Sequence, residues 1–310
     1  MRNQSFSELG DYTVNKIKSF LKNDDRALTI LILPALILMV LLVFIPLASG
    51  LNISFTNWNG YSQKYKYIGF ENYIRLLSDK VFHKAFINTL IYGFGSTIIQ
   101  TILGLAYALL LCKKFMLRTI TRTIVYLPAM VAQLIVGYIW YFMVKYDGGA
   151  LNDIMLLFGM EPLDWMAVGI RAVIIITFIN AIEYVGKTMI IFIAGLENIP
   201  VMYYEAASID GANSWYTFRK ITFPLLIPAI TTSLVLNIIG GLKLFGIIVS
   251  MTSGGPGYSS HSLSSLINSM YFGNQDAGYA AAIGMFTFIF IMFVSIITRS
   301  YLNKKEVSYN

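Results

Sequence analysis

The sequence predicts an all-α membrane protein with six transmembrane helices. Of its 310 residues, 56% are hydrophobic and only 13% are charged, and the mean hydropathy is +0.65. A soluble domain of this composition could not cover its surface with polar groups, and a disordered chain would be far less hydrophobic. Because most basic residues lie between apolar runs, the net charge of +7 indicates membrane topology rather than nucleic-acid binding.

Six apolar runs are long enough to cross a bilayer, whose core takes about 20 apolar residues of helix. They cover residues 28–49, 86–112, 123–144, 168–196, 225–251 and 280–301. Several exceed the required length, so we expect tilts or breaks. The chain accordingly divides into an N-terminal segment 1–26, a transmembrane domain 27–302 and a tail 303–310. The apolar spacing over 12–21 favours a short interfacial helix, and a charged disordered tail is the alternative.

The positions of Lys and Arg predict that both termini are cytoplasmic. Basic residues occur in the N-terminal segment, after the second and fourth runs, and at the C-terminus, whereas 146–167 and 252–279 contain none. The segment 52–84 fits less well, since we expect it outside and it holds five basic residues. This segment weakens the evidence for the predicted orientation but does not reverse the prediction.

The sequence offers no basis for catalysis or metal binding. It has no Gly-x-x-x-x-Gly-Lys-Ser/Thr loop for ATP, and no Ser/His/Asp constellation at membrane depth. Its two histidines, His83 and His261, are far apart, and Cys112 is the single cysteine. Metal clusters and internal disulfides are therefore not expected, and we predict no cofactor bound by this chain.

The most informative segment, 200–224, lies between the fourth and fifth runs. Its centre reads Tyr204-Glu205-Ala206-Ala207-Ser208-Ile209-Asp210-Gly211-Ala212. Pro200 is tolerated in a first helical turn, small side chains allow another protein to approach closely, and Gly211 permits the left-handed geometry that ends a helix. The segment therefore predicts a helix–turn–helix on the cytoplasmic face that fits a groove in a partner protein.

This segment resembles the EAA loop of permease subunits in bacterial ABC importers. That loop reads Glu-Ala-Ala, three residues, Gly, nine residues, Ile, one residue and Leu-Pro. The chain matches it, with Ile221 and Pro224 in place, except that Phe223 stands where Leu is usual. An ordinary connection between two spans would not keep this spacing. The resemblance implies the six-helix ABC importer permease fold, in a bacterial plasma membrane, with a coupling helix that contacts an ATPase through Glu205, Ala206, Ala207, Asp210 and Gly211.

Further stretches resemble the carbohydrate-uptake permeases related to the maltose transporter. They are 67–73 with 86–90, 194–200, 252–256 and 278–282. The last two fit the first of the two permeases of such systems, although Gly246 stands where many carry Asp. The resemblance implies a heterodimer with a second permease, two ATP-binding cassette subunits that use ATP and Mg, an extracellular solute-binding protein, and no nucleic acid. The chain itself would perform no bond chemistry.

Three ionisable residues within the spans are candidates for the solute path, because such groups are costly in lipid and usually face the bundle interior. Glu183 and Lys187 lie in the fourth span and Lys243 in the fifth. Glu183 and Lys187 are four residues apart, so they could pair on one helical face. They would form a polar wall that hydrogen-bonds sugar hydroxyls. The alternatives are that the two residues form a structural ion pair, or that Lys187 extends its ammonium group toward the membrane interface. For Lys243 a structural role is favoured.

Aromatic and amide side chains complete the candidate solute path. Aromatic rings suit sugar faces, although most aromatics in such a chain belong to its core or to the interfacial belt. Amides at mid-span depth need partners. The candidates of these two types are Trp140, Asn180, Tyr184, Asn237 and Phe245.

We therefore predict the transmembrane subunit of an ATP-driven importer that translocates a sugar or oligosaccharide and contacts membrane lipid. One alternative is an importer permease for a non-sugar solute such as glycerol phosphate, and another is a stand-alone carrier or intramembrane enzyme. The EAA segment argues against a carrier, which has no ATPase to engage. A phosphate ester would favour a cationic cluster, whereas Lys187 is accompanied by Glu183.

Overall fold

The computed structural model describes residues 24–113 and 116–304, and it is helical almost throughout those ranges, with one isolated antiparallel bridge between Thr56 and Tyr67. The predicted all-α class is confirmed. The chain forms two compact units, Met1–Ile53 and Ser54–Asn310. The interfacial helix expected at 12–21 lies outside the described residues.

From residue 24, where the described part of the chain begins, the first unit is a continuous run of helix. It contains α2 (Asp24–Met39), a π-helical turn η1 (Val40–Phe44) and α3 (Ile45–Ser54). The stretch Ile32–Ser54 is a candidate membrane span of 23 residues with a mean hydropathy of 2.7. At about 1.5 Å of rise per residue it is long enough for the hydrocarbon core of a bilayer.

The second unit contains the remaining helices and is where the functional residues lie. In chain order these are α4 (Glu71–Ser78), α5 (Lys80–Leu90), η2 (Ile91–Gly95), α6 (Ser96–Leu111), α7 (Arg118–Tyr126), η3 (Leu127–Met130), α8 (Gln133–Val144), α9 (Ala150–Leu157), α10 (Gly169–Glu197), α11 (Val201–Ile209), α12 (Ser214–Thr217), η4 (Phe218–Thr222), α13 (Phe223–Leu225), α14 (Ile227–Leu242), α15 (Gly246–Met251), α16 (Leu263–Asn268), η5 (Ser269–Gly273) and α17 (Ala277–Asn303).

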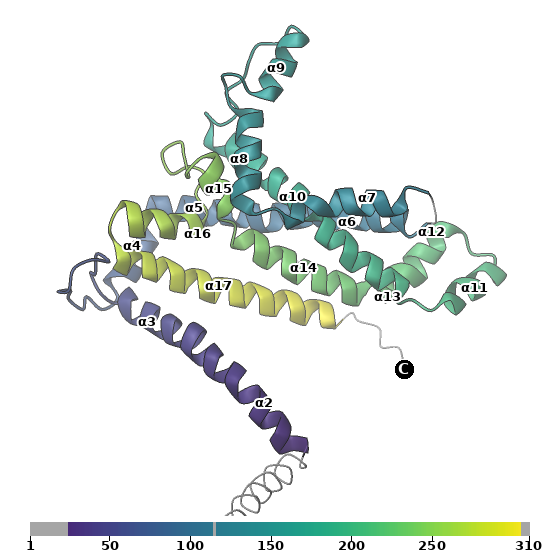
Figure 1. The fold of residues 1–310 in the computed structure, drawn as a ribbon, viewed down its shortest axis with the longest axis horizontal. Coiled ribbons are helices and arrows are strands. Elements are labelled where there is room, and N and C mark those ends of the chain that lie inside the picture. Colours follow the sequence, from purple (N-terminus) through teal and green to yellow (C-terminus); the bar gives the residue numbers. More distant parts are fainter. Residues whose placement is uncertain (1–23, 114–115, 305–310) are drawn as a thin grey trace, which may run out of the picture. The chain divides into compact units, whose positions relative to one another are not determined.

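Four long helical segments run side by side in this unit: α5 with η2 and α6, α10, α14, and α17 (Figure 1). Helix α10 packs against α6 and α14, and α14 also packs against α17. Each of the four segments provides a candidate membrane span. With the span of the first unit they make five among the described residues, or up to six if the bent pair described below crosses as one.

Small residues let these helices approach closely, as is usual inside membranes. A side chain at Gly104 on α6 would meet Thr188 Cγ2 at 2.6 Å and the backbone nitrogen of Met189 at 3.2 Å, both on α10. A side chain at Gly241 on α14 would meet the Cα of Gly93 at 2.8 Å. The contacts of α6, α10 and α14 therefore depend on glycines at which any larger side chain would clash with the neighbouring helix.

The third predicted span, 123–144, is not one straight helix. Helix α7 and the 3-10 turn η3 end at Met130, and α8 starts at Gln133 after a bend of 100°. The sequence explains the break, since Pro128 lacks an N–H to continue α7 and the residue before a proline disfavours helix. Val131 and Ala132 then adopt extended backbone, with ψ of 144° and 135°.

The fifth predicted span is also interrupted. Helix α14 ends at Leu242, and α15 begins at Gly246 after a non-helical residue, Phe245, with φ −137°. Helix α15 packs against α8, where a side chain at Gly246 would lie 2.7 Å from Gln133 Cβ and one at Gly137 would overlap Ser250. The two interrupted spans therefore meet through their short helices α8 and α15.

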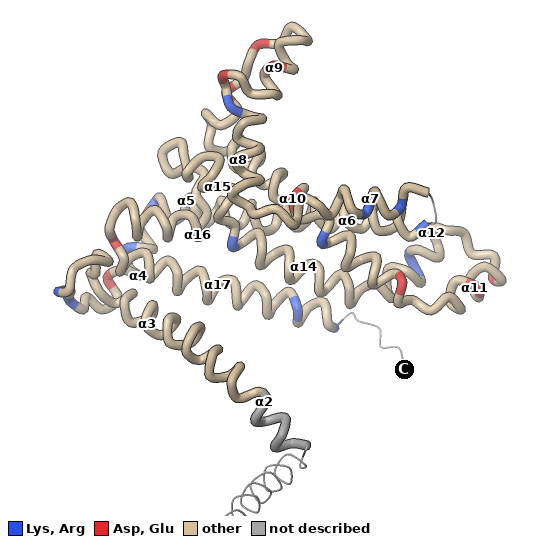
Figure 2. Tube along the Cα trace, viewed as in Figure 1, with Lys and Arg blue, Asp and Glu red and all other residues tan. Residues whose placement is uncertain are grey.

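Figure 2 shows that charged residues gather at the two ends of the long helices of the second unit and around α9, with few in between. Within the four candidate spans of this unit, only Glu183, Lys187 and Lys243 lie more than about two turns from either end. This distribution is the one a bilayer imposes, because charge at mid-membrane depth is costly.

We expect Gly104→Ala to lower the free energy of unfolding by about 1–3 kcal/mol, because the added methyl group overlaps Thr188 and the backbone of α10. Gly284→Ala is the matched control, since its methyl group would meet nothing closer than Ile267 at 3.9 Å. Thermal unfolding in detergent measures both variants. Equal midpoints would show that α6 and α10 do not depend on this contact.

Candidate functional site

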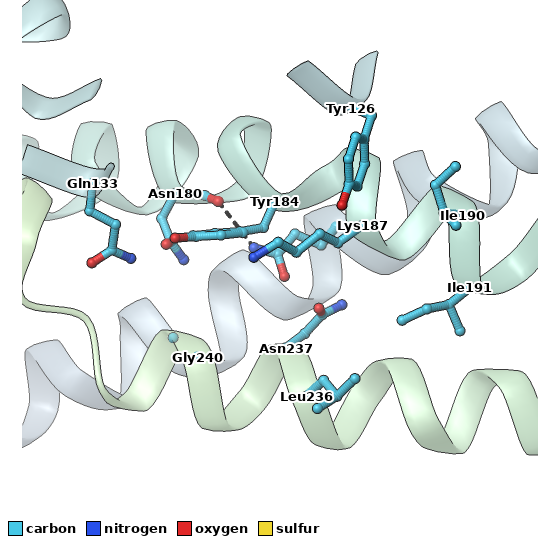
Figure 3. A pocket seen from close by; sticks show the side chains of 12 residues that line it. Tyr126, Gln133, Asn180, Tyr184, Lys187, Ile190, Ile191, Leu236, Asn237 and Gly240 are labelled. Carbon is cyan, nitrogen blue, oxygen red and sulfur yellow. Dashed lines mark hydrogen bonds between the residues drawn. The ribbon is translucent and has the colours of Figure 1, made fainter. Parts of the chain in front are cut away.

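A cavity of about 560 Å³ opens between α6, α10 and α14 in the second unit. Its polar lining consists of four amides, two phenols and one ammonium group: Gln100, Gln133, Asn180, Asn237, Tyr126, Tyr184 and Lys187. Gln100 comes from α6, Asn237 from α14, and the rest from α10 and the bent α7–α8 segment. Figure 3 shows these side chains of α7, α8, α10 and α14 converging on the same space.

The amides of the cavity satisfy one another only in part. Gln100 Nε2 donates to the backbone oxygen of Asn180 at 3.1 Å, yet Gln100 Oε1 and Asn180 Oδ1 have no hydrogen-bond partner among the described residues. Asn237 Nδ2 donates to Thr188 Oγ1 at 2.9 Å and to Ser233 Oγ at 3.3 Å. Buried polar groups usually find partners, so these two buried acceptors leave the polar wall of the cavity incompletely satisfied.

Glu183 and Lys187 do not pair as the sequence allowed. No ion pair joins them within the described residues. The Lys187 ammonium lies instead over the Tyr184 ring, 4.4 Å from its centroid, as the two labelled side chains in Figure 3 show, in a cation–π contact. Glu183 is only 1% exposed, and neither of its carboxylate oxygens has a hydrogen-bond partner in the described parts of the chain.

Three other candidates lie away from this cavity. Trp140 on α8 packs against the hydrophobic cluster of Val136 and Ile247. Phe245 is half-buried at the start of α15. Lys243 lines a second cavity, of about 580 Å³, with residues of α14, α16 and α17. The first cavity thus brings together Asn180, Tyr184, Lys187 and Asn237, whereas Glu183, Trp140, Lys243 and Phe245 do not line it.

The sequence interpretation missed Gln100, Gln133 and Tyr126. The two glutamines carry the signal that selected Asn180 and Asn237, since each is an amide within an apolar run and needs a partner there. Tyr126 carries no such signal. It reaches the cavity because α7 ends there, at a bend that Pro128 signals but the unbroken hydropathy of 123–144 does not.

The segment 200–224 forms the helix–turn–helix that its sequence predicts. Gly211 has φ +72°, and the Ala212 N–H donates to Ala207 O at 2.9 Å while the Gly211 N–H donates to Ser208 O at 3.1 Å. These two bonds form a Schellman motif, which ends α11. Pro200 caps α11 from the position just before its first residue, one position earlier than expected.

The surface of this segment is unusually apolar. Glu205, Ala206 and Asp210 are exposed, whereas Ala207 is buried. Large apolar side chains around them are also exposed: Val201, Met202, Ile209, Trp215 and Tyr216. These exposed apolar side chains, on α11 and α12, are of the kind that interaction sites present. The buried Ala207, and a bond of 3.3 Å between Tyr204 and Thr222 that joins α11 to η4, hold the segment together.

Residues 100–306 match the family of the binding-protein-dependent transport system inner membrane component. The chain belongs to this family. The permease is therefore a transporter subunit and not an enzyme, and it crosses the membrane several times. The match includes the cavity and the segment 200–224.

Two relatives and one solved structure are similar to this permease over most of its length. It is 33% identical over 279 residues to the probable starch degradation products transport system permease protein AmyD of Thermoanaerobacterium thermosulfurigenes, covering 89% of this chain and 94% of the relative. It is 32% identical over 284 residues to the trehalose/maltose transport system permease protein MalF of Thermococcus litoralis, covering 91% and 96%. A chain of a bacterial ABC transporter involved in the import of the acidic polysaccharide alginate has the same fold, with a TM-score of 0.79, 21% identity and coverage of 94% and 99%. The predicted ABC importer permease fold is confirmed.

We expect Glu183→Gln to raise the free energy of unfolding of the permease by at least about 1 kcal/mol, because a buried carboxylate without partners loses its hydration on folding without replacement. Thermal unfolding in detergent measures the change. Glu161→Gln, at an exposed acid that forms no ion pair in the described chain, is the control. A lower midpoint for Glu183→Gln would mean that a partner satisfies the carboxylate.

Proposed function

We propose that this permease is the transmembrane subunit of an ATP-driven importer for a sugar or oligosaccharide, and that the solute passes through the cavity between α6, α10 and α14. The observation that carries the proposal is the lining of that cavity. It consists of amides, phenols and one ammonium, and includes no acid among the described residues. Sugar hydroxyls both donate and accept hydrogen bonds, and such groups can meet both needs.

The polar groups of the cavity have distinct roles in this proposal. Gln100 Oε1 and Asn180 Oδ1 accept bonds from sugar hydroxyls, since they have no partner in the described chain. The amide of Asn237, already engaged with Thr188, holds α14 beside α10. Tyr184 presents its ring to a sugar face, and Lys187 donates to ring or hydroxyl oxygens from above that ring.

A phosphate ester is the less favoured solute. Sites for phosphate usually gather several cationic donors, often a bidentate arginine, whereas Lys187 is the one cation among the described residues that line the cavity. The names of the two relatives, which refer to starch degradation products and to trehalose and maltose, also favour a sugar.

The segment 200–224 is the proposed docking site for an ATP-binding cassette subunit. Glu205, Ala206 and Asp210 would contact it, Gly211 would set the direction of the turn, and Ala207 would pack beneath. Two such subunits bind ATP and Mg, a second permease completes a heterodimer, and a solute-binding protein delivers the sugar from outside. Both termini are then cytoplasmic, and the membrane is a bacterial plasma membrane. The exposed apolar surface of this segment and the binding-protein-dependent family support this assembly.

We expect the complete complex, reconstituted in liposomes with its solute-binding protein outside and ATP inside, to accumulate a sugar. The permease alone is expected neither to hydrolyse ATP nor to move solute. A panel of neutral oligosaccharides and glycerol phosphate, each radiolabelled, identifies the solute. Accumulation by the permease alone would contradict an importer, and accumulation of glycerol phosphate without any sugar would contradict the solute class.

We expect Gly211→Val to weaken the binding of the ATP-binding cassette subunit, because a β-branched residue at φ +72° carries strain of about 1–3 kcal/mol. Gly211→Asn is the matched variant, since Asn tolerates left-handed backbone. The measurement is the amount of ATPase subunit that co-purifies with tagged permease, together with uptake. If both variants retain the ATPase as the wild type does, Gly211 does not shape the docking surface.

A further inference from the structure

Three charged residues meet at the end of the second unit that carries α11. Glu197 Oε1 accepts a hydrogen bond from Arg118 Nη2 at 3.0 Å and another from Arg122 Nη2 at 3.3 Å. Arg122 Nη2 also donates to the backbone oxygen of Leu111 at 3.3 Å. This set of Arg118, Arg122 and Glu197, here called the Glu197 cluster, joins the ends of α6, α7 and α10.

The Glu197 cluster lies directly beside the root of α11. Glu197 is the last residue of α10, and α11 begins at Val201 after three intervening residues. The connection is stiff, because the Asn198 N–H donates to Ala194 O at 3.2 Å and the Ile199 N–H donates to Leu196 O at 3.3 Å. Ile199 is also buried. A displacement of α11 must therefore move Glu197.

The other end of α7 reaches the cavity. Helix α7 lies against α10, where a side chain at Gly186 would come within 2.6 Å of Tyr126 Cα. Tyr126 ends α7 and lines the cavity, and Gln133 lines it just after the bend. Arg118 and Arg122 are one helical turn apart, so both hold the same face of α7 to Glu197. Helix α7 is thus attached to Glu197 at one end and reaches the cavity at the other.

We propose that the Glu197 cluster transmits the movement of α11 to the α7–α8 bend and so to Tyr126 and Gln133 in the cavity, with Glu197 as the positioning residue. This inference rests on the proposed function. Glu197 is half-exposed, at 55% of its side chain, whereas Arg118 and Arg122 are mostly buried, at 27% and 25%. Exposed ion pairs contribute little to stability. The ion pairs are therefore expected to contribute little to the stability of the fold, so their loss should affect transmission more than folding.

The test uses the complete complex in liposomes with saturating solute-binding protein, and it measures sugar imported per ATP hydrolysed. Glu197→Gln removes the charge and keeps the size of the side chain, and the double variant Arg118→Gln with Arg122→Gln removes the cluster from the other side. Lys304→Gln is the control, since it removes an exposed charge that forms no ion pair in the described chain. Glu197→Asp keeps the carboxylate and shortens its reach by one methylene.

We expect both cluster variants to retain the ATPase subunits and to hydrolyse ATP, while sugar imported per ATP falls by about three- to tenfold, the order expected from the loss of two exposed ion pairs. Combining the three substitutions should cause no further fall, because all interrupt the same link. The ratio of imported sugar to hydrolysed ATP should fall less in Glu197→Asp than in Glu197→Gln, and in Lys304→Gln it should equal that of the wild type. A merely structural role would lower transport and hydrolysis together.

Three results would overturn the inference while sugar uptake by the wild-type complex continues. The first is a wild-type ratio of imported sugar to hydrolysed ATP in Glu197→Gln. The second is a wild-type ratio in the arginine double variant together with a reduced ratio in Glu197→Gln, which would assign Glu197 a role without the arginines. The third is a failure of every cluster variant to assemble, which would assign the cluster to folding. Failure of the proposed function has a different signature, since the wild-type complex would then import no sugar.

Discussion

The structure of the permease depends first on one requirement. Within the membrane there is no water to pair with backbone N–H and C=O groups, so each must find a hydrogen-bond partner in the protein. Non-helical backbone is tolerated there only inside protein or beside a cavity, and both interruptions in the second unit obey this rule. At the first, the Val131 N–H donates to Pro128 O at 3.1 Å, and Gln133 follows at the edge of the cavity. At the second, Ser262 Oγ donates to Leu244 O at 2.6 Å. The first break is thus accommodated beside the cavity, and the second inside the protein.

Features set by local chemistry could be predicted from the sequence, and features set by packing could not. The apolar runs reflect hydropathy alone, and Gly211 reflects the left-handed position that a Schellman motif requires. The bend after Met130 was missed although Pro128 signals it, because hydropathy continues unbroken through the bend. The unpaired Glu183 was missed because residues four apart are offset by about 40° around a helix. That offset is enough to bury Glu183 while leaving Lys187 exposed to the cavity.

The same limit explains why the candidate site was only partly predicted. A single sequence gives the depth of a polar residue in a span but not the helical face that looks inward. Asn180, Tyr184 and Lys187 recur at helical spacing and share one face of α10, so they reach the cavity together. Trp140 and Phe245 lie on the far side of the two breaks, where α8 and α15 turn toward each other. Their position depends on contacts between helices distant in the sequence, which hydropathy does not contain.

The two ends of the second unit are held by different kinds of interaction, and this difference bears on how the permease can move. At the end opposite α11, buried bonds fasten the loop before α16: Asn88 Nδ2 donates to Ser259 O at 2.7 Å, and the Tyr92 hydroxyl donates to Ser260 O at 2.8 Å. Burial lowers the pKa of His261 there, so its imidazole is neutral at pH 7 and adds no charge to the packing. At the α11 end the helices also pack through a buried cluster that includes Leu111, Phe192 and Leu226, and the partly exposed ion pairs of Glu197 fasten α7 to the end of α10. In the proposed transmission, movement of α11 would therefore act on α7 through Glu197, and the other end of α7 meets the bend beside the cavity.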